Sequence, residues 1–181
     1  MRARAVFLDR DGVLNRAVVR EGRPRPPATL QDLEILPGVA DACGTLRLAG
    51  LRLIVVTNQP EVGRGTLALD VVNEMNLALK RGLRLDDVRV CPHDDGDRCE
   101  CRKPAPGMLL AAAREWDISL PASVMVGDRW RDVESGKRAG CKTVFIDYGY
   151  AEPRPESPDL VVRSLAEAVP WILRTLEGIS P

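Results

Sequence analysis

Ala5–Asn15, with the sequence AVFLDRDGVLN, is the most informative segment of the chain. A short apolar run ends in two aspartates, Asp9 and Asp11, and Gly12 follows at once. Residues two apart in an extended segment point the same way, so the two carboxylates converge at the end of a buried strand. Like charges that close repel unless a cation lies between them or one of them holds a proton. The stretch therefore predicts a divalent-metal site, and phosphoryl chemistry is the best reason for one.

The rest of the chain alternates short apolar runs, expected to be strands, with segments whose apolar residues recur at spacings of three and four, expected to be helices. The expected strands are Ala5–Leu8, Leu53–Val56, Val88–Val90, Val124–Val126 and Thr143–Ile146, with Leu160–Val162 as a short edge strand. The expected helices are Val39–Leu48, Val71–Leu79, Met108–Trp116 and Arg131–Ala139, and a last helix that Ser164 caps. This alternation predicts an α/β fold, a three-layer, doubly wound parallel sheet of the Rossmann-like kind. Ligands of such folds bind beyond the carboxyl ends of the strands.

Length and composition limit the class of protein. The 181 residues are enough for a buried core, and no insertion is long enough for a separate cap domain, so residues 1–181 are expected to form a single domain. Lys plus Arg and Asp plus Glu each total 26, and this balance argues against a nucleic-acid partner. No apolar run has membrane-spanning length, and the charges at 9–11 interrupt the first run too early for a signal peptide. We expect a cytoplasmic monomer with no membrane partner.

Polar residues with useful chemistry follow four of the expected strands. They are Asp9 and Asp11 after the first, Thr57, Asn58 and Gln59 after the second, Lys103 after the third, and Asp128 with Asp132 after the fourth. Taken singly, an Asp-x-Asp pair is most often a solvated loop and a Gly-Asp pair a turn. Together, at one sheet edge, these types supply a nucleophile, a general acid, metal ligands and donors for phosphoryl oxygens.

The four elements resemble the four motifs of the haloacid-dehalogenase-like (HAD) phosphohydrolases. The matching segments are Phe7–Gly12 (FLDRDG), Val56–Gln59 (VTNQ), Arg102–Gly107 (RKPAPG) and Val126–Asp132 (VGDRWRD). The resemblance covers almost the whole chain. It is strongest to the subgroup of D,D-heptose bisphosphate phosphatases and histidinol-phosphate phosphatases, through the DRDGVLN and TNQ sequences, Arg64-Gly65 and a Cys–His cluster before Arg102.

This resemblance implies a role for each matched residue. Asp9 is expected to be the nucleophile that forms an aspartyl-phosphate, and Asp11 the group that protonates the leaving alcohol and then activates water. Asp9, the backbone carbonyl of Asp11 and Asp128 are expected to bind Mg2+. Thr57 and Lys103 are expected to hold the phosphoryl oxygens, with Asp132 orienting Lys103. The expected substrate contacts are Asn58, Gln59, Arg102, Arg129 and Arg20.

A second metal site is indicated by the cysteines and the single histidine. Cys91, His93, Cys99 and Cys101 offer four ligands within eleven residues, a set that suits a closed, tetrahedral zinc site. Their spacing differs from the two-residue gaps of zinc fingers, so a loop with free cysteines is the alternative from the residues alone. The resemblance implies a zinc-bound loop that directs Arg102 and Lys103 toward the site.

The substrate is expected to be a small sugar bisphosphate. Arg20–Pro27 is rich in proline and arginine and is expected to be a loop or flap, whose arginines either bind a second phosphate or are simply solvated. The resemblance points to the C7 phosphate of D-glycero-D-manno-heptose 1,7-bisphosphate, with histidinol phosphate as the alternative. A phospho-acceptor receiver-like signalling domain is the alternative from another class, because it too uses aspartates, a threonine and a lysine on a doubly wound sheet.

Overall fold

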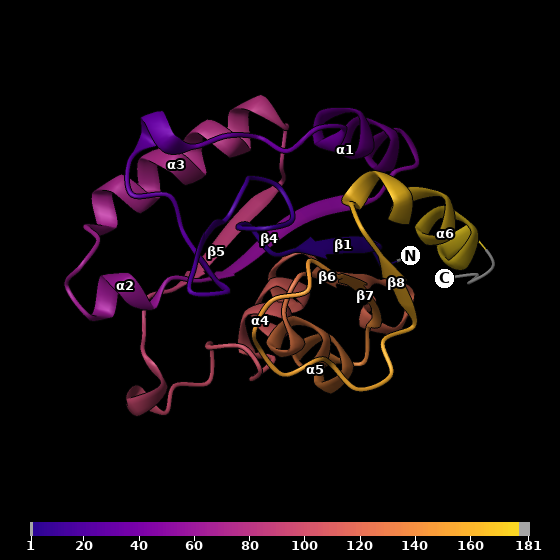
Figure 1. Cartoon of the computed structure of the whole chain (residues 1–181). Coiled ribbons are helices and arrows are strands. Elements are labelled where there is room, and N and C mark those ends of the chain that lie inside the picture. The colour runs from indigo at the N-terminus through magenta and orange to yellow at the C-terminus, as the bar shows by residue number, and fades with distance from the viewer. Residues whose placement is uncertain (1, 178–181) are drawn as a thin grey trace.

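A six-stranded parallel sheet forms the centre of the molecule in the computed structural model, which describes residues 2–177 (Figure 1). The strand order is β5-β4-β1-β6-β7-β8, and every pairing in this sheet is parallel. The strands are β1 (Ala5–Leu8), β4 (Arg52–Asn58), β5 (Asp87–Cys91), β6 (Val124–Gly127), β7 (Lys142–Ile146) and β8 (Leu160–Val162). The expected α/β fold with a doubly wound parallel sheet is therefore confirmed.

Helices cover both faces of the sheet and give the three layers. They are α1 (Val39–Leu48), α2 (Pro60–Gly63), α3 (Leu69–Gly82), α4 (Gly107–Glu115), α5 (Trp130–Ala139) and α6 (Leu165–Glu177). Val6 and Leu8 of β1 pack with α1, α3 and α6, while Ala5 and Phe7 face α4 and α5 (Figure 1). Strand β1 is thus apolar on both faces because both are buried, which is why its sequence does not alternate.

Two short elements differ from the sequence-based expectation. Arg20–Pro27, expected to be a loop or flap, contributes to an antiparallel hairpin of β2 (Val18–Arg20) and β3 (Arg23–Arg25). Its turn places Glu21 and Gly22 at φ values of 51° and 72°, as a two-residue hairpin turn requires. Pro24 lies within β3, where a two-stranded ribbon leaves one side of each strand unpaired and tolerates the missing N–H. Helix α2 was also not expected, because four residues carry no periodic signal.

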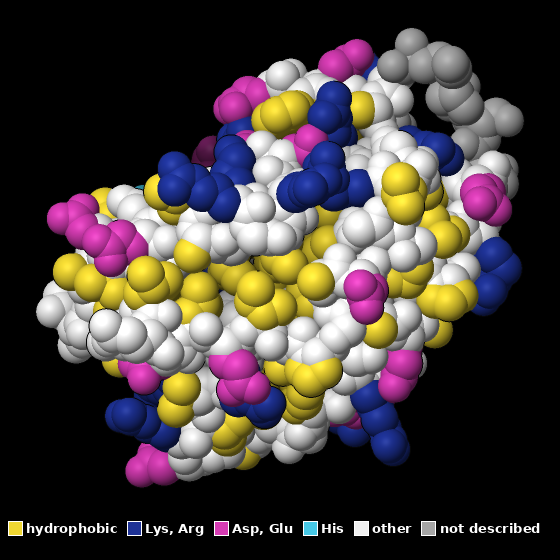
Figure 2. Space-filling view, turned by 90° about the horizontal axis from the view of Figure 1, so that it is seen from above, with side chains coloured by type: hydrophobic (Ala, Val, Ile, Leu, Met, Phe, Trp, Pro, Cys, Tyr) yellow, Lys and Arg dark blue, Asp and Glu magenta, His cyan; other side chains and the backbone are white. Residues whose placement is uncertain are grey.

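The outer surface of the layer of α1, α3 and α6 is mixed in character. Figure 2 views the side on which α1, α3 and α6 lie, where hydrophobic side chains are interspersed with charged ones. Leu48, Leu69 and Leu77 are among the exposed large hydrophobic residues of these helices. Within residues 2–177, no helix is both long and apolar enough to cross a membrane.

Candidate active site

The carboxyl ends of β1, β4 and β6 bring Asp9, Thr57 and Asp128 to one edge of the sheet because these three strands are neighbours. Lys103 joins them from the loop that precedes α4, and its side chain is 2% exposed. Its ammonium lies 2.8 Å from Asp9 Oδ1 and 2.6 Å from Asp132 Oδ1, and it donates a 2.7 Å hydrogen bond to the Val56 carbonyl. The buried charge is therefore fully paired, as burial of an ammonium requires.

This pairing sets the protonation of the lysine. Burial alone lowers the pKa of Lys103, but the charges of Asp132 and Asp9 outweigh burial and raise it above its usual value. The amine is therefore a fixed positive charge beside Asp9. A fixed cation at this position can bind an oxyanion, such as a transferring phosphoryl group.

Asp128 is the conspicuous unsatisfied group of the site. The residue is 2% exposed, and within residues 2–177 no donor meets hydrogen-bond geometry at either carboxylate oxygen. The neighbouring Tyr150 hydroxyl acts to lower the pKa of Asp128, but this effect is outweighed. Burial, followed by the charges of Asp9 and Asp132, raises the pKa of Asp128 well above its usual value. Burial also raises the pKa of Asp9 to about 6, against the opposing effect of Lys103.

The unsatisfied carboxylates fit a hard divalent cation. Oxygen atoms of Asp9, Asp128 and Asp132 lie within 4.8 Å of one another. Oxygen ligands of this kind suit Mg2+. Gly12 lets the backbone after β1 approach this group, because a Cβ at that position would lie 1.9 Å from Asp128 Oδ2. Both carboxylate oxygens of Asp132 are already used, Oδ1 by Lys103 and Oδ2 by the Arg129 amide, whereas Lys103 occupies only Oδ1 of Asp9. Asp9 and Asp128 are therefore the residues with oxygens left to hold the ion.

Asp11 is held in a different environment from Asp9. Its carboxylate accepts hydrogen bonds from Arg10 (3.0 to 3.2 Å), Asn15 (2.9 Å) and Gln59 (2.8 Å). Arg10 is itself fully buried and anchored on Asn76. Each aspartate of the pair thus has its own cationic side chain, Lys103 for Asp9 and Arg10 for Asp11. Arg10 and Asn15 were not among the expected site residues, although an arginine between two site carboxylates could have indicated a role in pairing with one of them.

Thr57 and Asn58 at the end of β4 and Gln59 just after it are linked by hydrogen bonds to each other and to neighbouring site residues. Gln59 is fully buried, and its amide donates to Thr57 Oγ1 at 3.0 Å as well as to Asp11. Asn58 makes a reciprocal pair with the backbone of Lys103, donating to its carbonyl at 3.0 Å and accepting from its N–H at 3.1 Å. These bonds fix the loop that carries Lys103 against the end of β4. The expected substrate contacts of Asn58 and Gln59 stay predictions.

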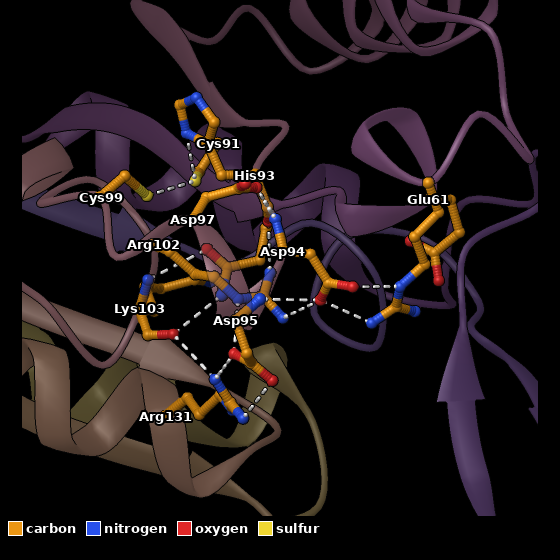
Figure 3. Close-up of polar contacts among 12 residues, drawn as sticks. Glu61, Cys91, His93, Asp94, Asp95, Asp97, Cys99, Arg102, Lys103 and Arg131 are labelled. Atoms are coloured by element: carbon orange, nitrogen blue, oxygen red, sulfur yellow. Dashed lines mark hydrogen bonds and ion pairs between the residues drawn. The ribbon is translucent and has the colours of Figure 1, made fainter.

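The arginines around the cleft are tied to carboxylates. Arg102 donates to Asp95 Oδ1 at 2.8 Å and to the His93 carbonyl at 3.0 Å, and Arg131 grips the same Asp95 at 2.7 and 3.2 Å (Figure 3). Arg129 forms a similar two-point pair with Glu152. The cleft at Asp9 is small, about 50 Å3, and is lined by Asp9, Asp11, Pro24, Arg25, Pro26, Asn58, Pro60, Glu61, Lys103, Arg129, Arg131 and Asp132. Arg20, by contrast, lies outside this cleft, on the flap.

The predicted second metal cluster is assembled beside the site. Cys91 ends β5, and the ligand atoms of Cys91, His93, Cys99 and Cys101 all lie within 4.8 Å of one another. Their closest separations are 3.1 to 3.6 Å, near the roughly 3.8 Å between sulfurs around a tetrahedral ion with 2.3 Å bonds. The loop then continues directly into Arg102 and Lys103. Figure 3 shows Cys91, His93 and Cys99 of this cluster next to the Asp95 ion pairs.

The sheet, the Asp9–Lys103–Asp128 group and the loop cluster define a class, the HAD phosphatases. A family model described as HAD-hydrolase-like matches residues 100–168. The chain is 36% identical to D-glycero-D-manno-heptose-1,7-bisphosphate 7-phosphatase of Thermosynechococcus vestitus, covering 93% of this chain and 94% of that protein. It is 39% identical to the D-glycero-beta-D-manno-heptose-1,7-bisphosphate 7-phosphatase of Yersinia pestis, covering 90% and 92%.

Solved structures agree with this class. The D,D-heptose 1,7-bisphosphate phosphatase of B. bronchiseptica, complexed with magnesium and phosphate, superposes with a TM-score of 0.78 at 28% identity, covering 94% of this chain and 98% of that one. The chain belongs to the family of HAD phosphatases that contains these relatives, and it is a phosphoric monoester hydrolase.

Proposed function

We propose that the protein is a Mg2+-dependent phosphatase that removes the C7 phosphate of D-glycero-D-manno-heptose 1,7-bisphosphate. The observation that carries the proposal is the juxtaposition of Asp9 with the buried Lys103 ammonium at 2.8 Å and with the unsatisfied Asp128. A nucleophilic carboxylate, a fixed cation and an open pair of metal ligands are what phosphomonoester hydrolysis needs. The bisphosphate named in the relatives suits a cleft surrounded by arginines.

The reaction proceeds in two displacements at phosphorus. An oxygen of Asp9 attacks, the bond between phosphorus and the C7 oxygen breaks, and Asp11 gives its proton to the leaving alcohol. Water then attacks the aspartyl-phosphate, giving its proton to Asp11 and releasing inorganic phosphate and Asp9. When bound to Asp9, the backbone carbonyl of Asp11 and Asp128, Mg2+ supplies positive charge for the phosphoryl oxygens.

Several residues act by positioning the reacting groups. Thr57 and Lys103 hold the phosphoryl oxygens, while Asp132 orients the lysine. Gln59 bridges Thr57 and Asp11, and so relates the phosphoryl site to the proton donor. The Arg10 guanidinium aligns the Asp11 carboxyl through hydrogen bonds to both of its oxygens.

We propose zinc for the cluster of Cys91, His93, Cys99 and Cys101. Three thiolates and one imidazole are soft or borderline ligands, and four protein ligands leave no position open for substrate. Zinc there is structural: it fixes the loop whose Asp95 holds Arg102 and Arg131. We further propose that residues 1–181 act as one domain and as a cytoplasmic monomer, for which light scattering should give about the chain mass of 19.9 kDa.

The test is steady-state kinetics on both anomers of the heptose bisphosphate, histidinol phosphate and simple sugar phosphates. We expect one bisphosphate anomer to reach a kcat/KM above about 10^4 M⁻¹s⁻¹, the low end for a physiological substrate. Histidinol phosphate as the best substrate would reassign the enzyme within its class. A stable phosphoprotein without turnover would instead support the receiver-like alternative.

A further inference from the structure

A cavity of about 780 Å3 lies under the flap, which we define as the β2–β3 hairpin, Val18–Arg25. This cavity adjoins the catalytic cleft, because Arg25, Pro26 and Glu61 line both spaces. The cleft itself, at about 50 Å3, has room for a phosphoryl group or a few waters and not for a sugar. The rest of any sugar phosphate must therefore extend outward, and the flap cavity has the size of a typical ligand pocket.

Near the site, the arginines that are not neutralised by a carboxylate lie on the flap rather than around the cleft. Outside the flap, the arginines in or beside the cleft are each paired with a carboxylate at 2.5 to 2.8 Å. Arg131 and Arg129, which line the cleft, pair with Asp95 and Glu152, and Arg102, next to Lys103, pairs with Asp95. Within residues 2–177, Arg20 and Arg23 make no ion pair, and both line the flap cavity. A ligand anion gains most from cations that are not already neutralised.

A second cavity of about 300 Å3 touches Asp128 and Arg129 on the other side of the cleft, but its charges are already balanced. Arg129 is paired with Glu152, and Arg154 is paired with Asp147. An anion entering there would have to break a close ion pair first. The flap cavity is therefore the better site for a second anionic group.

One contact marks the boundary between the cleft and the flap cavity. Arg25 Nη1 meets Glu61 Oε1 at 3.5 Å, a loose contact beside those of the cleft arginines. The Arg25 side chain is 48% exposed, whereas that of Glu61 is 16% exposed. Of the other acids that line the cavity, Asp32 accepts hydrogen bonds from Thr29, and Glu21 lies at the hairpin turn. Glu61 is thus the carboxylate nearest to the part of a bound substrate that extends out of the cleft into the flap cavity.

Resting on the proposed function, we infer that the non-reacting phosphate of the substrate binds in the flap cavity and displaces Glu61 from Arg25. Arg25 is then a specificity-determining residue, with Arg20 and Arg23 adding charge. Glu61 stands in for the substrate anion in the free enzyme. A phosphate dianion replaces a single carboxylate oxygen at 3.5 Å with a two-point contact to the guanidinium. The pair therefore favours bisphosphates over monophosphates of the same sugar.

The experiment compares kcat/KM for heptose 1,7-bisphosphate with kcat/KM for heptose 7-phosphate on the same preparation. Both substrates share the reacting phosphate, so damage to folding or chemistry cancels in their ratio. Arg25→Ala should lower the ratio about tenfold, because a charge-assisted contact to phosphate is lost. Glu61→Gln should raise it about threefold, because the competing carboxylate is gone. Arg16→Gln is the matched control, since Arg16 lies at the flap base and pairs with Glu34, and its ratio should equal that of the wild type.

Different results would contradict the proposed function and the phosphate site in the flap cavity. If the wild type does not hydrolyse the bisphosphate, the proposed function is wrong. If the wild type prefers the bisphosphate and Arg25→Ala leaves that preference intact, the flap-cavity site is wrong and the function stands. A lower ratio for Glu61→Gln would show that Glu61 helps to bind the bisphosphate. The inference that Glu61 and the substrate phosphate compete for Arg25 would then be wrong.

Discussion

The catalytic cleft has two walls that are built in different ways. On one wall, Asp9, Thr57, Lys103 and Asp128 are at most 7% exposed and lie at the ends of buried strands or directly against them. The other wall consists of the flap and the metal loop, which we define as Cys91–Arg102. Asp95 of the metal loop is held by ion pairs to Arg102 and Arg131, and Arg25 of the flap makes a loose contact with Glu61. If the proposed roles hold, the reacting groups depend on the sheet, whereas the choice of substrate depends on loops that can change independently of it.

The largest effect is expected on the buried wall. Asp9→Asn should reduce kcat at least about 10^4-fold, because an amide cannot attack phosphorus. The variant should unfold at the same temperature as the wild type or higher, since it removes a buried like charge beside Asp128 and Asp132. Activity assays and thermal unfolding measure the two effects. Asp41→Asn, an exposed position on α1, is the control.

If a substitution in the flap or the metal loop lowered kcat more than Asp9→Asn does, the buried wall would not be the part that carries the chemistry. Such a result would also require another nucleophile at the sheet edge.

The metal loop should show the next largest effect, and mainly on stability. Cys101→Ser should release the bound zinc and lower the melting temperature by roughly 10 °C, because zinc binding contributes to folding free energy. The KM should rise, since the loop also carries the partners of Arg102 and Arg131. Zinc content by atomic absorption, thermal unfolding and kinetics test this, with zinc restored to chelated wild type as the control. Unchanged kinetics in verified zinc-free protein would defeat the link between the loop and the substrate.

The buried wall was predictable from the sequence and most of the other wall was not. Asp9 and Asp128 come directly after apolar strands, and parallel strands align their carboxyl ends at one edge, so their meeting with Lys103 could be expected from the sequence. Their catalytic and metal-binding roles stay predictions. The partnerships of Arg129 with Glu152 and of Asp95 with Arg131 were missed, since both join residues far apart in sequence through loop conformations that have no periodic signal. The hairpin of β2 and β3 was missed because prolines in its sequence suggested a loop.

Substitution of Asp95 tests whether the metal loop orients Arg102 and Arg131. Asp95→Asn should raise KM about five- to tenfold with a smaller change in kcat, because Arg102 and Arg131 lose the charge that orients them toward the cleft. Asp95→Glu should restore part of the affinity. Glu115→Gln removes a comparable carboxylate from Arg89, away from the cleft, and is the control. Zinc content should stay the same in all three variants, and a lost zinc ion would show that Asp95 only supports the loop.

The smallest effect expected is a pH dependence of Mg2+ stabilisation on the buried wall. Without metal, the raised pKa values of Asp9, about 6, and Asp128 mean that the native state holds more protons than the unfolded chain above about pH 4. The stability of the metal-free protein therefore falls as the pH rises through 6. Mg2+ binds the ionised carboxylates, so it should raise the melting temperature by roughly 5 °C more at pH 7.5 than at pH 5.

Thermal unfolding in EDTA and in Mg2+ at the two pH values measures this effect. Asp128→Asn should abolish the difference. Equal Mg2+ shifts at both pH values in the wild type would mean that the carboxylates are ionised before the metal arrives.

The tip of the flap touches the loop after β7 through one backbone contact with a measurable consequence. The Ala151 amide donates a 2.8 Å hydrogen bond to the Gly22 carbonyl, and a Cβ on Gly22 would lie 2.8 Å from that of Ala151. This amide is shielded from solvent deuterium only while the hairpin is seated. Under conditions where every opening leads to exchange, its hydrogen-exchange rate is the rate at which the hairpin detaches. Comparing that rate with turnover tests whether flap movement limits the enzyme.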